Sequence, residues 1–339
     1  MKYPYTSKLI EYLAPEINAR VELEPEFEFA GEIIFSNGRK HLFRNTDLNI
    51  NLAGAGGIAK DKGYTSYLLT KYGFRVPRGQ TFFSERLLPN LDIDKRRDIE
   101  SACKYGYEMG YPVIVKPNNL SQGALVCKVH NDDDLRSVAE MIFERTNVML
   151  VQELCIGKDY RIVVLGDEII SAYQRLPLTV TGDGKSTIES LILQKQSKFP
   201  DLGRPNAEIR PEDFRIWAKL EYLGLTRDSV ISKGESLILL DNANLSTGGD
   251  AIDVTDTLHY SYADLAIKIA KTMGLRLCGV DIMCPNAEET LSENYWVIEV
   301  NGAPGLDNYA AIGDDQTERV KTLYRKVLKF LEQNAAFCF

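Results

Sequence analysis

The stretch Trp296-Val-Ile-Glu-Val-Asn-Gly-Ala-Pro-Gly305 is a short apolar run that ends in a carboxylate, an amide and two glycines. If Trp296 to Asn301 form a strand, the side chains of Glu299 and Asn301 leave the same face, because strand residues two apart do so. The run therefore predicts two oxygen ligands side by side near the end of a strand.

A second apolar run, Leu277-Cys-Gly-Val-Asp-Ile-Met283, carries a carboxylate, Asp281, in its middle. If the two runs are neighbouring strands, Asp281 and Glu299 approach to about 4 Å, where like charges repel by about 4 kcal/mol at an effective dielectric near 20. Such a pair requires a cation, and oxygen-only ligands favour Mg²⁺. The alternative is a strand-end acid followed by an Asn-Gly turn, and these runs alone leave both interpretations open.

Length and composition limit the class of protein. The chain has 339 residues, enough for two or three packed subdomains with a full enzyme interior. Its 44% hydrophobic and 26% charged residues are typical of an ordinary globular protein. A net charge of −8 argues against a nucleic-acid partner.

The cysteines and the termini indicate a compartment. Six cysteines form no CxxC pair, and the polar segment from Met1 to Ser7 does not resemble a secretory leader. No apolar run approaches the ~18 residues of a membrane span. Cys338 is next to last, whereas a prenylation signal needs a cysteine fourth from the end. We therefore expect a cytoplasmic protein with no membrane partner.

The first 75 residues contain a hairpin and a helix. The pair Asn37-Gly38 predicts a hairpin that joins strands at 30–35 and 40–43, and it carries no evident chemistry. The glycine-rich run 52–58 lacks a dinucleotide-binding pattern and predicts a flexible approach to a helix over 60–71. Lys62 lies in the first turn of this helix, where the dipole disfavours a cation, so it is either exposed or held by an anion.

A second hairpin carries a lysine at a strand end. Strands are predicted at 111–117 and 124–129, and they flank the polar loop 118–123. Lys116 is placed to hold phosphates with its charge while N–H groups of the loop cover them. The alternative is a lysine that extends from the strand end into solvent.

The middle of the chain predicts three strands and a turn. The strand 148–157 runs into a short connection where Glu153 could accept the exocyclic amine of a flat base, and strands follow at 159–165 and 169–175. The run 181–187 is not a P-loop, because Thr179 stands where the first glycine is required. Instead, Ser186 and Glu189 predict a capping box for a helix over 188–194, and residues 196–215 predict a mobile flap.

Taken in order, these features resemble the ATP-grasp superfamily of carboxylate–amine ligases. The matching set is Asp61-Lys62, Val115-Lys116-Pro117, Gln152-Glu153, Gly157-Lys-Asp159, Asp281 and Glu299-Val-Asn301. Further motifs are similar to the ATP-grasp module of cyanophycin synthetase and of bifunctional glutathione synthetases: Gly157-Lys-Asp-Tyr-Arg161, Thr181-Gly-Asp-Gly184, Asn244-Leu-Ser-Thr-Gly-Gly249 and Ala251-Ile-Asp-Val-Thr255. Together the matches extend from about residue 58 to residue 330.

The resemblance implies an α+β protein with the ATP-grasp fold, in which two α/β lobes hold ATP between antiparallel sheets. It divides the chain into a short N-terminal unit (1–75), a small lobe (76–152) and a large lobe (153–335) with the metal site and a flap at 176–215. The implied cofactors are ATP and Mg²⁺ or Mn²⁺. The implied partners are amino-acid or peptide substrates, selected by the N-terminal unit and the flap, and a homo-oligomer is compatible with the sequence.

The resemblance also implies a role for each residue of the site. Phosphates, adenine and ribose of ATP would be held by Lys62, Lys116, Ser121, Gln122, Gly123, Glu153, Leu154, Ile156 and Asp159. The metal ligands would be Asp281, Glu299 and Asn301. Arg161 and Arg175 would act in catalysis near the transferred phosphoryl group. The substrate pocket would be lined by Asn244, Ser246, Gly248 and Gly249.

The implied reaction has two steps. A substrate carboxylate attacks the γ-phosphoryl group of ATP to give an acyl phosphate and ADP, and an amine then displaces phosphate. The alternatives are a small-molecule kinase, a ligase like glutathione synthetase and a non-catalytic ATP-binding module. Leu154 departs from the basic residue of many relatives, and without a second, Mur-ligase-like module we do not expect a full two-residue polymer cycle.

Overall fold

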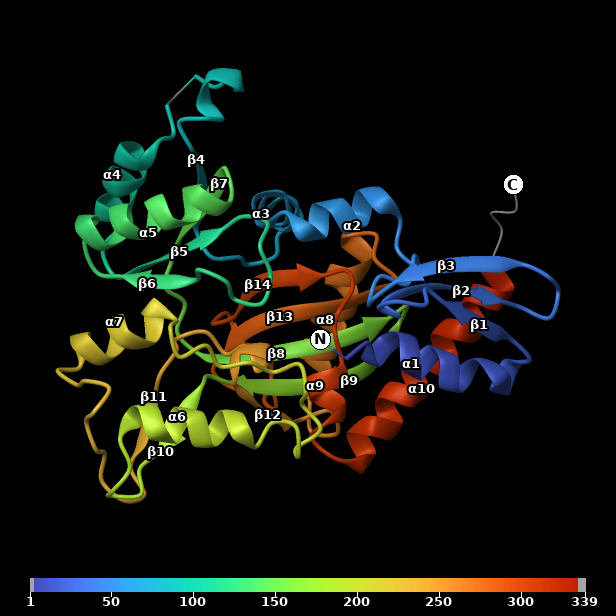
Figure 1. The fold of residues 1–339 in the computed structure, drawn as a ribbon. Coiled ribbons are helices and arrows are strands. Elements are labelled where there is room, and N and C mark those ends of the chain that lie inside the picture. The colour runs from blue at the N-terminus through green and yellow to red at the C-terminus, as the bar shows by residue number, and fades with distance from the viewer. Residues whose placement is uncertain (1–2, 95, 335–339) are drawn as a thin grey trace.

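The structure is a computed structural model, and it describes residues 3–94 and 96–334; Cys338, considered above, lies outside them. Four antiparallel sheets organise the described residues (Figure 1). Two of them, of four and five strands, form the walls of a cavity of about 880 Å³. No helix in the described ranges combines the length and the apolar character needed to cross a membrane.

The N-terminal unit is a helix followed by a three-stranded sheet. The hairpin predicted around Asn37-Gly38 is confirmed, since Ile34 pairs with Lys40 and Gly38 has a φ of +81°. The unit packs against the long C-terminal helix, with Leu13 and Leu323 in one buried cluster. The elements are α1 (Tyr5–Leu13), β1 (Arg20–Leu23), β2 (Ala30–Ile34), β3 (Lys40–Arg44) and α10 (Asp314–Asn334).

The glycine-rich run is helical, so the prediction of a flexible segment is wrong. It forms α2 (Ala53–Lys60), and α3 (Lys62–Lys71) follows after Asp61, which caps α3 by accepting a hydrogen bond from the Tyr64 N–H at 2.8 Å. Ile58 and Ala59 of α2 pack on the core of the five-stranded sheet. Burial of these apolar side chains outweighs the low helix propensity of glycine.

The four-stranded sheet has α4 and α5 packed on one face (Figure 1). Val113 and Val115 of its strand β5 point into the core beneath these helices, whereas Ile114 and Lys116 point into the cavity. The predicted alternation is thus confirmed. In the order β4-β7-β5-β6 the strands are Gly79–Phe83, Val148–Glu153, Val113–Pro117 and Cys127–Val129, and the helices are α4 (Ile99–Met109) and α5 (Asp132–Arg145).

The five-stranded sheet carries the charged centre of the molecule. The two apolar runs are neighbouring strands as predicted, with Asp281 opposite Glu299 on one side and opposite Arg161 on the other. Helix α8 (Tyr260–Thr272) packs on the face away from the cavity. In the order β12-β9-β8-β13-β14 the strands are Asp250–Asp253, Glu168–Leu176, Lys158–Leu165, Leu277–Cys284 and Trp296–Asn301.

Residues 178–240 form a further packed unit, here called the inserted unit. It has its own hydrophobic cluster, in which Phe199, Ile209 and Ile216 are almost fully buried. The region where we predicted a flap at 196–215 thus contributes core residues, and the unit extends beyond residue 215. Its elements are β10 (Thr179–Thr181), α6 (Ile188–Ser197), α7 (Phe214–Tyr222) and β11 (Ser236–Ile238).

The capping box predicted for α6 is wrong. Thr187 caps this helix, because its side chain accepts a hydrogen bond from the Ser190 N–H at 3.2 Å. Ser186 instead donates to Asp183 at 2.7 Å and belongs to the preceding turn. Two adjacent hydroxyl residues can each serve as a helix cap, and the turn at Asp183 selects the second.

The packing of α1 on α10 can be tested by truncation of a core side chain. Leu13 is fully buried, so Leu13→Ala is expected to lower the free energy of unfolding by about 2–5 kcal/mol. Leu42 on β3 is 68% exposed, and Leu42→Ala is expected to change it by less than about 0.5 kcal/mol. Urea unfolding measures both values. Equal losses in the two variants would contradict the packing described.

Candidate functional site

A cavity of about 880 Å³ lies between the four-stranded and five-stranded sheets. Most of the predicted site residues line it, although they come from distant parts of the sequence. Those that line it are Lys62, Lys116, Ser121, Gln122, Gly123, Glu153, Leu154, Ile156, Asp159, Arg161, Arg175, Asn244, Ser246, Asp281, Glu299 and Asn301. The predicted residues Gly248 and Gly249 are not part of the lining.

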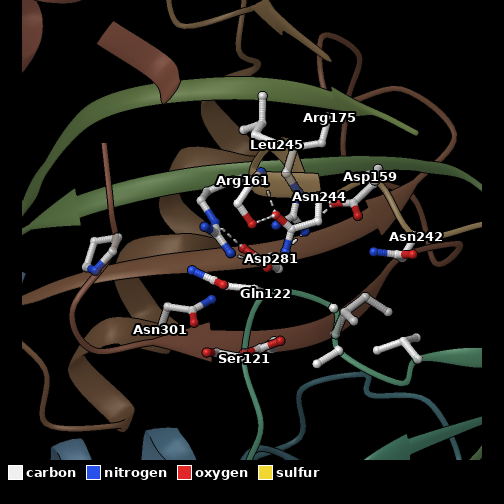
Figure 2. Close-up of a pocket in the computed structure, with 18 of the residues that line it drawn as sticks. Ser121, Gln122, Asp159, Arg161, Arg175, Asn242, Asn244, Leu245, Asp281 and Asn301 are labelled. Atoms are coloured by element: carbon white, nitrogen blue, oxygen red, sulfur yellow. Dashed lines mark hydrogen bonds and ion pairs between the residues drawn. The ribbon is translucent and has the colours of Figure 1, made fainter. Parts of the chain in front are cut away.

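Asp281 is the centre of the charged cluster on the cavity floor (Figure 2). Arg161 donates to both of its carboxylate oxygens at 2.7 Å, and Arg175 lies 2.9 Å from one of them. Burial raises the pKa of Asp281, but the guanidiniums of Arg161 and Arg175 outweigh burial and hold it below its usual value. Asp281 is therefore a carboxylate at neutral pH.

These arginines change the interpretation of the pair Asp281 and Glu299. We predicted that two facing carboxylates need a cation, and register supplies one from the protein, since β8 places Arg161 opposite Asp281. Lys62 lies 3.8 Å from Glu299 and offsets the second charge. Charge repulsion alone therefore does not establish a metal site.

Asn301 connects Glu299 to the arginines. With its amide oriented to satisfy both neighbours, it donates to Glu299 Oε1 at 3.2 Å and accepts from Arg161 Nη2 at 2.9 Å. Glu299 and Asn301 share one face of β14 as predicted, and both line the cavity. Two carboxylates and one amide oxygen thus meet at the edge of the floor.

The two arginines retain hydrogen-bonding capacity. Arg175 donates to Asp159 Oδ1 through Nε at 3.0 Å and Nη2 at 2.6 Å, and Arg161 uses Nε and Nη2. In the described part of the chain, Nη1 of Arg175 makes no hydrogen bond, and Asp159 Oδ2 accepts none. These atoms face a cavity in which a ligand could bind them.

The two predicted phosphate lysines are buried. Lys62 is 9% exposed and donates to the Leu120 carbonyl at 2.8 Å. Of the two alternatives for this lysine, simple exposure to solvent is therefore excluded. Lys116 is 5% exposed, and within the described residues its ammonium group makes no hydrogen bond and no ion pair within 4 Å. Burial lowers the pKa of Lys116 to about 8, partly offset by Glu299. A buried, unpaired ammonium is costly unless an anion binds it.

The loop between β5 and β6 closes the cavity from above. Gln122 and Gly123 have φ values of +59° and +65°, which turn this loop toward the charged floor (Figure 2). Arg215 of the inserted unit donates to the Gly123 carbonyl, and Asn242 contacts Gly123 so closely that a Cβ there would lie 2.3 Å from its amide nitrogen. Lys62 and Arg215 therefore hold the loop from opposite sides.

Glu153, the last residue of β7, has a hydrogen-bond partner that the sequence did not reveal. Arg78 donates to its carboxylate from the backbone N–H at 2.9 Å and from Nε at 2.8 Å. Burial raises the pKa of Glu153, but the hydrogen bonds from Arg78 outweigh burial and lower it overall. The carboxylate also lines the cavity beside Leu154 and Ile156, so a role toward adenine stays a prediction.

The glycines of the predicted substrate motif lie behind the cavity wall. Arg204, which is 8% exposed, binds the carbonyls of Leu245 and Gly249 and turns this segment inward. Gly248 has a φ of +95°, and a Cβ there would lie 2.5 Å from Ile209. Asn244 and Ser246 remain on the cavity side, and Asn244 accepts from the Ser246 hydroxyl at 2.8 Å.

Comparison with known proteins agrees with this geometry. The family model described as D-ala D-ala ligase C-terminus matches residues 87–185, and the model of the RimK-like ATP-grasp domain matches residues 241–321. The chain belongs to the ATP-grasp superfamily. Most of the inserted unit falls between the two matched segments of this ATP-grasp chain.

Individual relatives are longer than this chain. It is 33% identical over 258 residues to the glutathione biosynthesis bifunctional protein GshAB of Mannheimia succiniciproducens. This alignment covers 73% of this chain and 32% of that protein. It is 30% identical over 261 residues to the cyanophycin synthetase of Geminocystis herdmanii, covering 75% and 28%. The chain thus spans about a third of the length of these relatives.

A solved structure shows the same fold. The bifunctional glutathione synthetase from Pasteurella multocida superposes with a TM-score of 0.57 at 24% identity, covering 95% of this chain and 44% of that one. The predicted α+β, ATP-grasp fold is therefore confirmed.

The charge state of Lys116 gives a test by pH. Above about pH 8 its ammonium is largely deprotonated in the free protein, and a bound polyphosphate would raise the pKa again. ATP binding near pH 9 is therefore expected to take up a proton, and binding near pH 7 to take up none, because Lys116 is already charged there. Calorimetry in buffers with different ionisation enthalpies measures the uptake. The variant Lys116→Met should show no proton uptake. If the wild-type protein binds ATP near pH 9 without proton uptake, Lys116 does not contact the phosphates.

The conformation of the loop gives a second test. Gly123→Ala introduces both backbone strain at positive φ, worth about 1 kcal/mol, and a contact with Asn242, so ATP affinity should fall about fivefold or more. Gly166→Ala is the matched control, because Gly166 has a φ of +61° and no neighbour within 4 Å of its Cβ position. The double variant Gly123→Ala with Asn242→Ala should recover part of the loss. Unchanged affinity in Gly123→Ala would show that the loop does not contact the nucleotide.

Proposed function

We propose that this protein is an ATP-dependent carboxylate–amine ligase, which joins an amino-acid or peptide carboxylate to an amine through an acyl phosphate. The observation that carries the proposal is the unpaired ammonium of Lys116, buried in the cavity that also holds Asp281, Glu299 and Asn301. A cation in this position, beside two carboxylates, suits the phosphates of a nucleotide–metal complex.

ATP would lie along the cavity from the β7 end to the charged floor. Lys62 and Lys116 would bind its phosphates beneath the loop of Ser121, Gln122 and Gly123. The short connection after β7 would hold adenine through Glu153 and the backbone of Leu154 and Ile156, and Asp159 would bind the ribose through its free Oδ2. The match of residues 87–185 to the D-ala D-ala ligase C-terminus model supports this placement in part, because that segment contains these residues apart from Lys62.

The residues at the edge of the floor would supply part of the ligand set of a magnesium or manganese ion. The described residues contain no cluster of three His, Cys, Asp or Glu side chains that would hold a metal alone. Glu299, Asn301 and Asp281 would instead supply part of an oxygen shell that phosphates and water complete, as is usual for Mg²⁺. When bound, the ion would neutralise charge on the phosphates.

In the first step the substrate carboxylate oxygen attacks the γ-phosphorus of ATP, the bond from this phosphorus to the β-phosphate oxygen breaks, and ADP leaves. Arg161 and Arg175 would offer guanidinium N–H groups to the charge that develops on the transferred group. Their Nε and Nη2 donors stay on Asp281 and Asp159, which orients the guanidiniums in advance.

In the second step an amine nitrogen attacks the carbonyl carbon, phosphate leaves, and the proton of the amine is lost to phosphate or solvent. Water must be kept out, because it would hydrolyse the acyl phosphate. The loop held by Lys62 and Arg215 covers the floor, and Asn244 and Ser246 line the adjacent wall. These residues would shield the intermediate and contact the substrates.

The proposal includes the division of labour along the chain. The N-terminal unit and the inserted unit would select substrates, while the lobes at 76–152 and 153–335 hold ATP. The five cysteines within residues 3–94 and 96–334 are buried and free, which is compatible with a reducing cytoplasm.

One assay distinguishes the proposed activity from its main alternative, a small-molecule kinase. The protein is incubated with ATP, Mg²⁺ and mixtures of amino acids and dipeptides, and ADP release and product mass are followed. A ligase yields a product in which two components have joined with loss of water. ADP formation together with a phosphorylated hydroxyl compound, and with no amide, would establish the kinase instead.

Substitution at the edge of the floor tests the roles of the carboxylates. Glu299→Gln keeps the shape and removes a charge, so kcat should fall about 100-fold, equivalent to about 2.7 kcal/mol, with little change in stability. Glu288→Gln, at an exposed position, is the control. Asp281→Asn should also abolish turnover, but it would destabilise the fold by about 3–5 kcal/mol, because it leaves two buried guanidiniums short of a partner. Near-normal turnover in Glu299→Gln would remove this residue from the site.

A further inference from the structure

The cavity extends past the charged floor to an end that ATP would not occupy. This end, here called the distal end, lies toward the N-terminal unit and the short helix α9 (Asp307–Ala310), which pack in one cluster. Figure 1 shows α9 beside α1 and the edge of the five-stranded sheet. The distal end is lined by Tyr5, Phe29, Thr46, Asn206, Asp307 and Asn308.

The two ends of the cavity differ in charge. The floor contains four cations, Lys62, Lys116, Arg161 and Arg175, together with three carboxylates, Asp159, Asp281 and Glu299. Among the described residues that line the distal end, Asp307 is the one with a charge at neutral pH, since burial raises the pKa of the Tyr5 phenol well above its usual value. An anionic group facing aromatic and amide side chains suits a small cation.

Asp307 has no cationic partner in the part of the chain that the structure describes. Its carboxylate accepts two hydrogen bonds from neutral amides, at 3.3 Å from Asn206 and 3.4 Å from Asn308. The nearby Arg204 does not pair with Asp307. It forms an ion pair with Asp250 at 3.2 Å and donates hydrogen bonds to the carbonyls of Leu245 and Gly249. A carboxylate has about four acceptor positions, so Asp307 can accept two or more further hydrogen bonds.

Asp307 also has no capping role that would account for its charge. It is the first residue of α9, but this helix makes no side-chain cap hydrogen bond. It lies two residues after Gly305. Pro304, just before that glycine, and Arg161 both lie beside Gly279, at 3.3 and 3.4 Å from the position that a Cβ would take there. Asp307 and Arg161 therefore belong to one continuous wall of the cavity.

We propose that Asp307 binds the ammonium group of the carboxylate substrate, which would be an α-amino acid or a peptide with a free N-terminus. This inference rests on the proposed ligase function. The substrate would lie as a zwitterion, with its ammonium group at Asp307 and its carboxylate toward Arg161 and Arg175. The two ends of the cavity favour this orientation and oppose its reverse.

Hydroxylamine makes the inference testable without knowledge of the amine substrate. It replaces the amine in the second step, so each activated carboxylate is released as a hydroxamate that can be measured. A panel of free amino acids and dipeptides, with ATP and Mg²⁺, identifies the substrates that are turned over. The N-acetyl derivative of each, which has lost the positive charge, is then compared with the free compound.

Wild-type protein should favour free over N-acetyl substrates by about tenfold or more in kcat/KM, the value of a hydrogen bond to a charged group. Asp307→Asn keeps the shape but removes the charge, and this preference should fall to about twofold or less, with the KM for ATP unchanged. Asp314→Asn is the matched control, because Asp314 is the exposed first residue of α10 and does not line the cavity. It should keep the wild-type preference.

The possible failures are separable. If Asp307→Asn keeps the full preference for free ammonium groups, or if wild-type protein turns over N-acetyl substrates equally well, the role of Asp307 is wrong and the ligase function stands. If no hydroxamate forms with any member of the panel, the ligase function fails and this inference with it. An unchanged thermal unfolding temperature and KM for ATP in Asp307→Asn would show that the loss of preference is not a loss of fold.

Discussion

The ion cluster of Asp281, Arg161 and Arg175 is the interaction on which the rest of the structure depends. It joins three adjacent strands, β13, β8 and β9, through side chains that are mostly buried. Buried charges are tolerated only when they are paired and hydrogen-bonded, and this cluster leaves few alternatives for the register of the sheet. A shift of one residue in β8 would turn Arg161 away from Asp281. The charges that serve the site therefore also specify the fold.

Local signals in the sequence predicted the elements whose causes are local. Asn37-Gly38 fixed a hairpin, and alternation in β5 placed Lys116 on the cavity face. The strand pairing of Asp281 with Glu299 followed from two apolar runs that each contain a carboxylate. Prediction failed where packing decides the outcome. The glycines of α2 form a helix because Ile58 and Ala59 are covered by the five-stranded sheet, and no pattern within the run contains that information.

For the site as well, the sequence predicted what local motifs determine and missed what long-range contacts determine. Motif spacing pointed to lysines and to carboxylate and amide side chains that line one cavity, because their neighbours in sequence are part of a family pattern. It missed Arg78, Arg215 and Asp307, whose partners or cavity neighbours are 75 or more residues away or belong to other elements. It also placed Gly248 and Gly249 in the substrate pocket, because the hydrogen bond from Arg204 to the Gly249 carbonyl cannot be predicted from composition. Long-range hydrogen bonds to backbone carbonyls leave little trace in a single sequence.

The contact of Arg215 with the Gly123 carbonyl has a consequence for thermodynamic linkage. The inserted unit has its own hydrophobic core, and it holds the loop above the floor from outside the two sheets. Any ligand that orders this loop must also favour the docked arrangement of the inserted unit, and by reciprocity docking strengthens binding of the ligand. For a nucleotide bound beneath the loop as proposed, the local stability of residues 178–240 would contribute to its affinity, although Arg215 itself does not line the cavity.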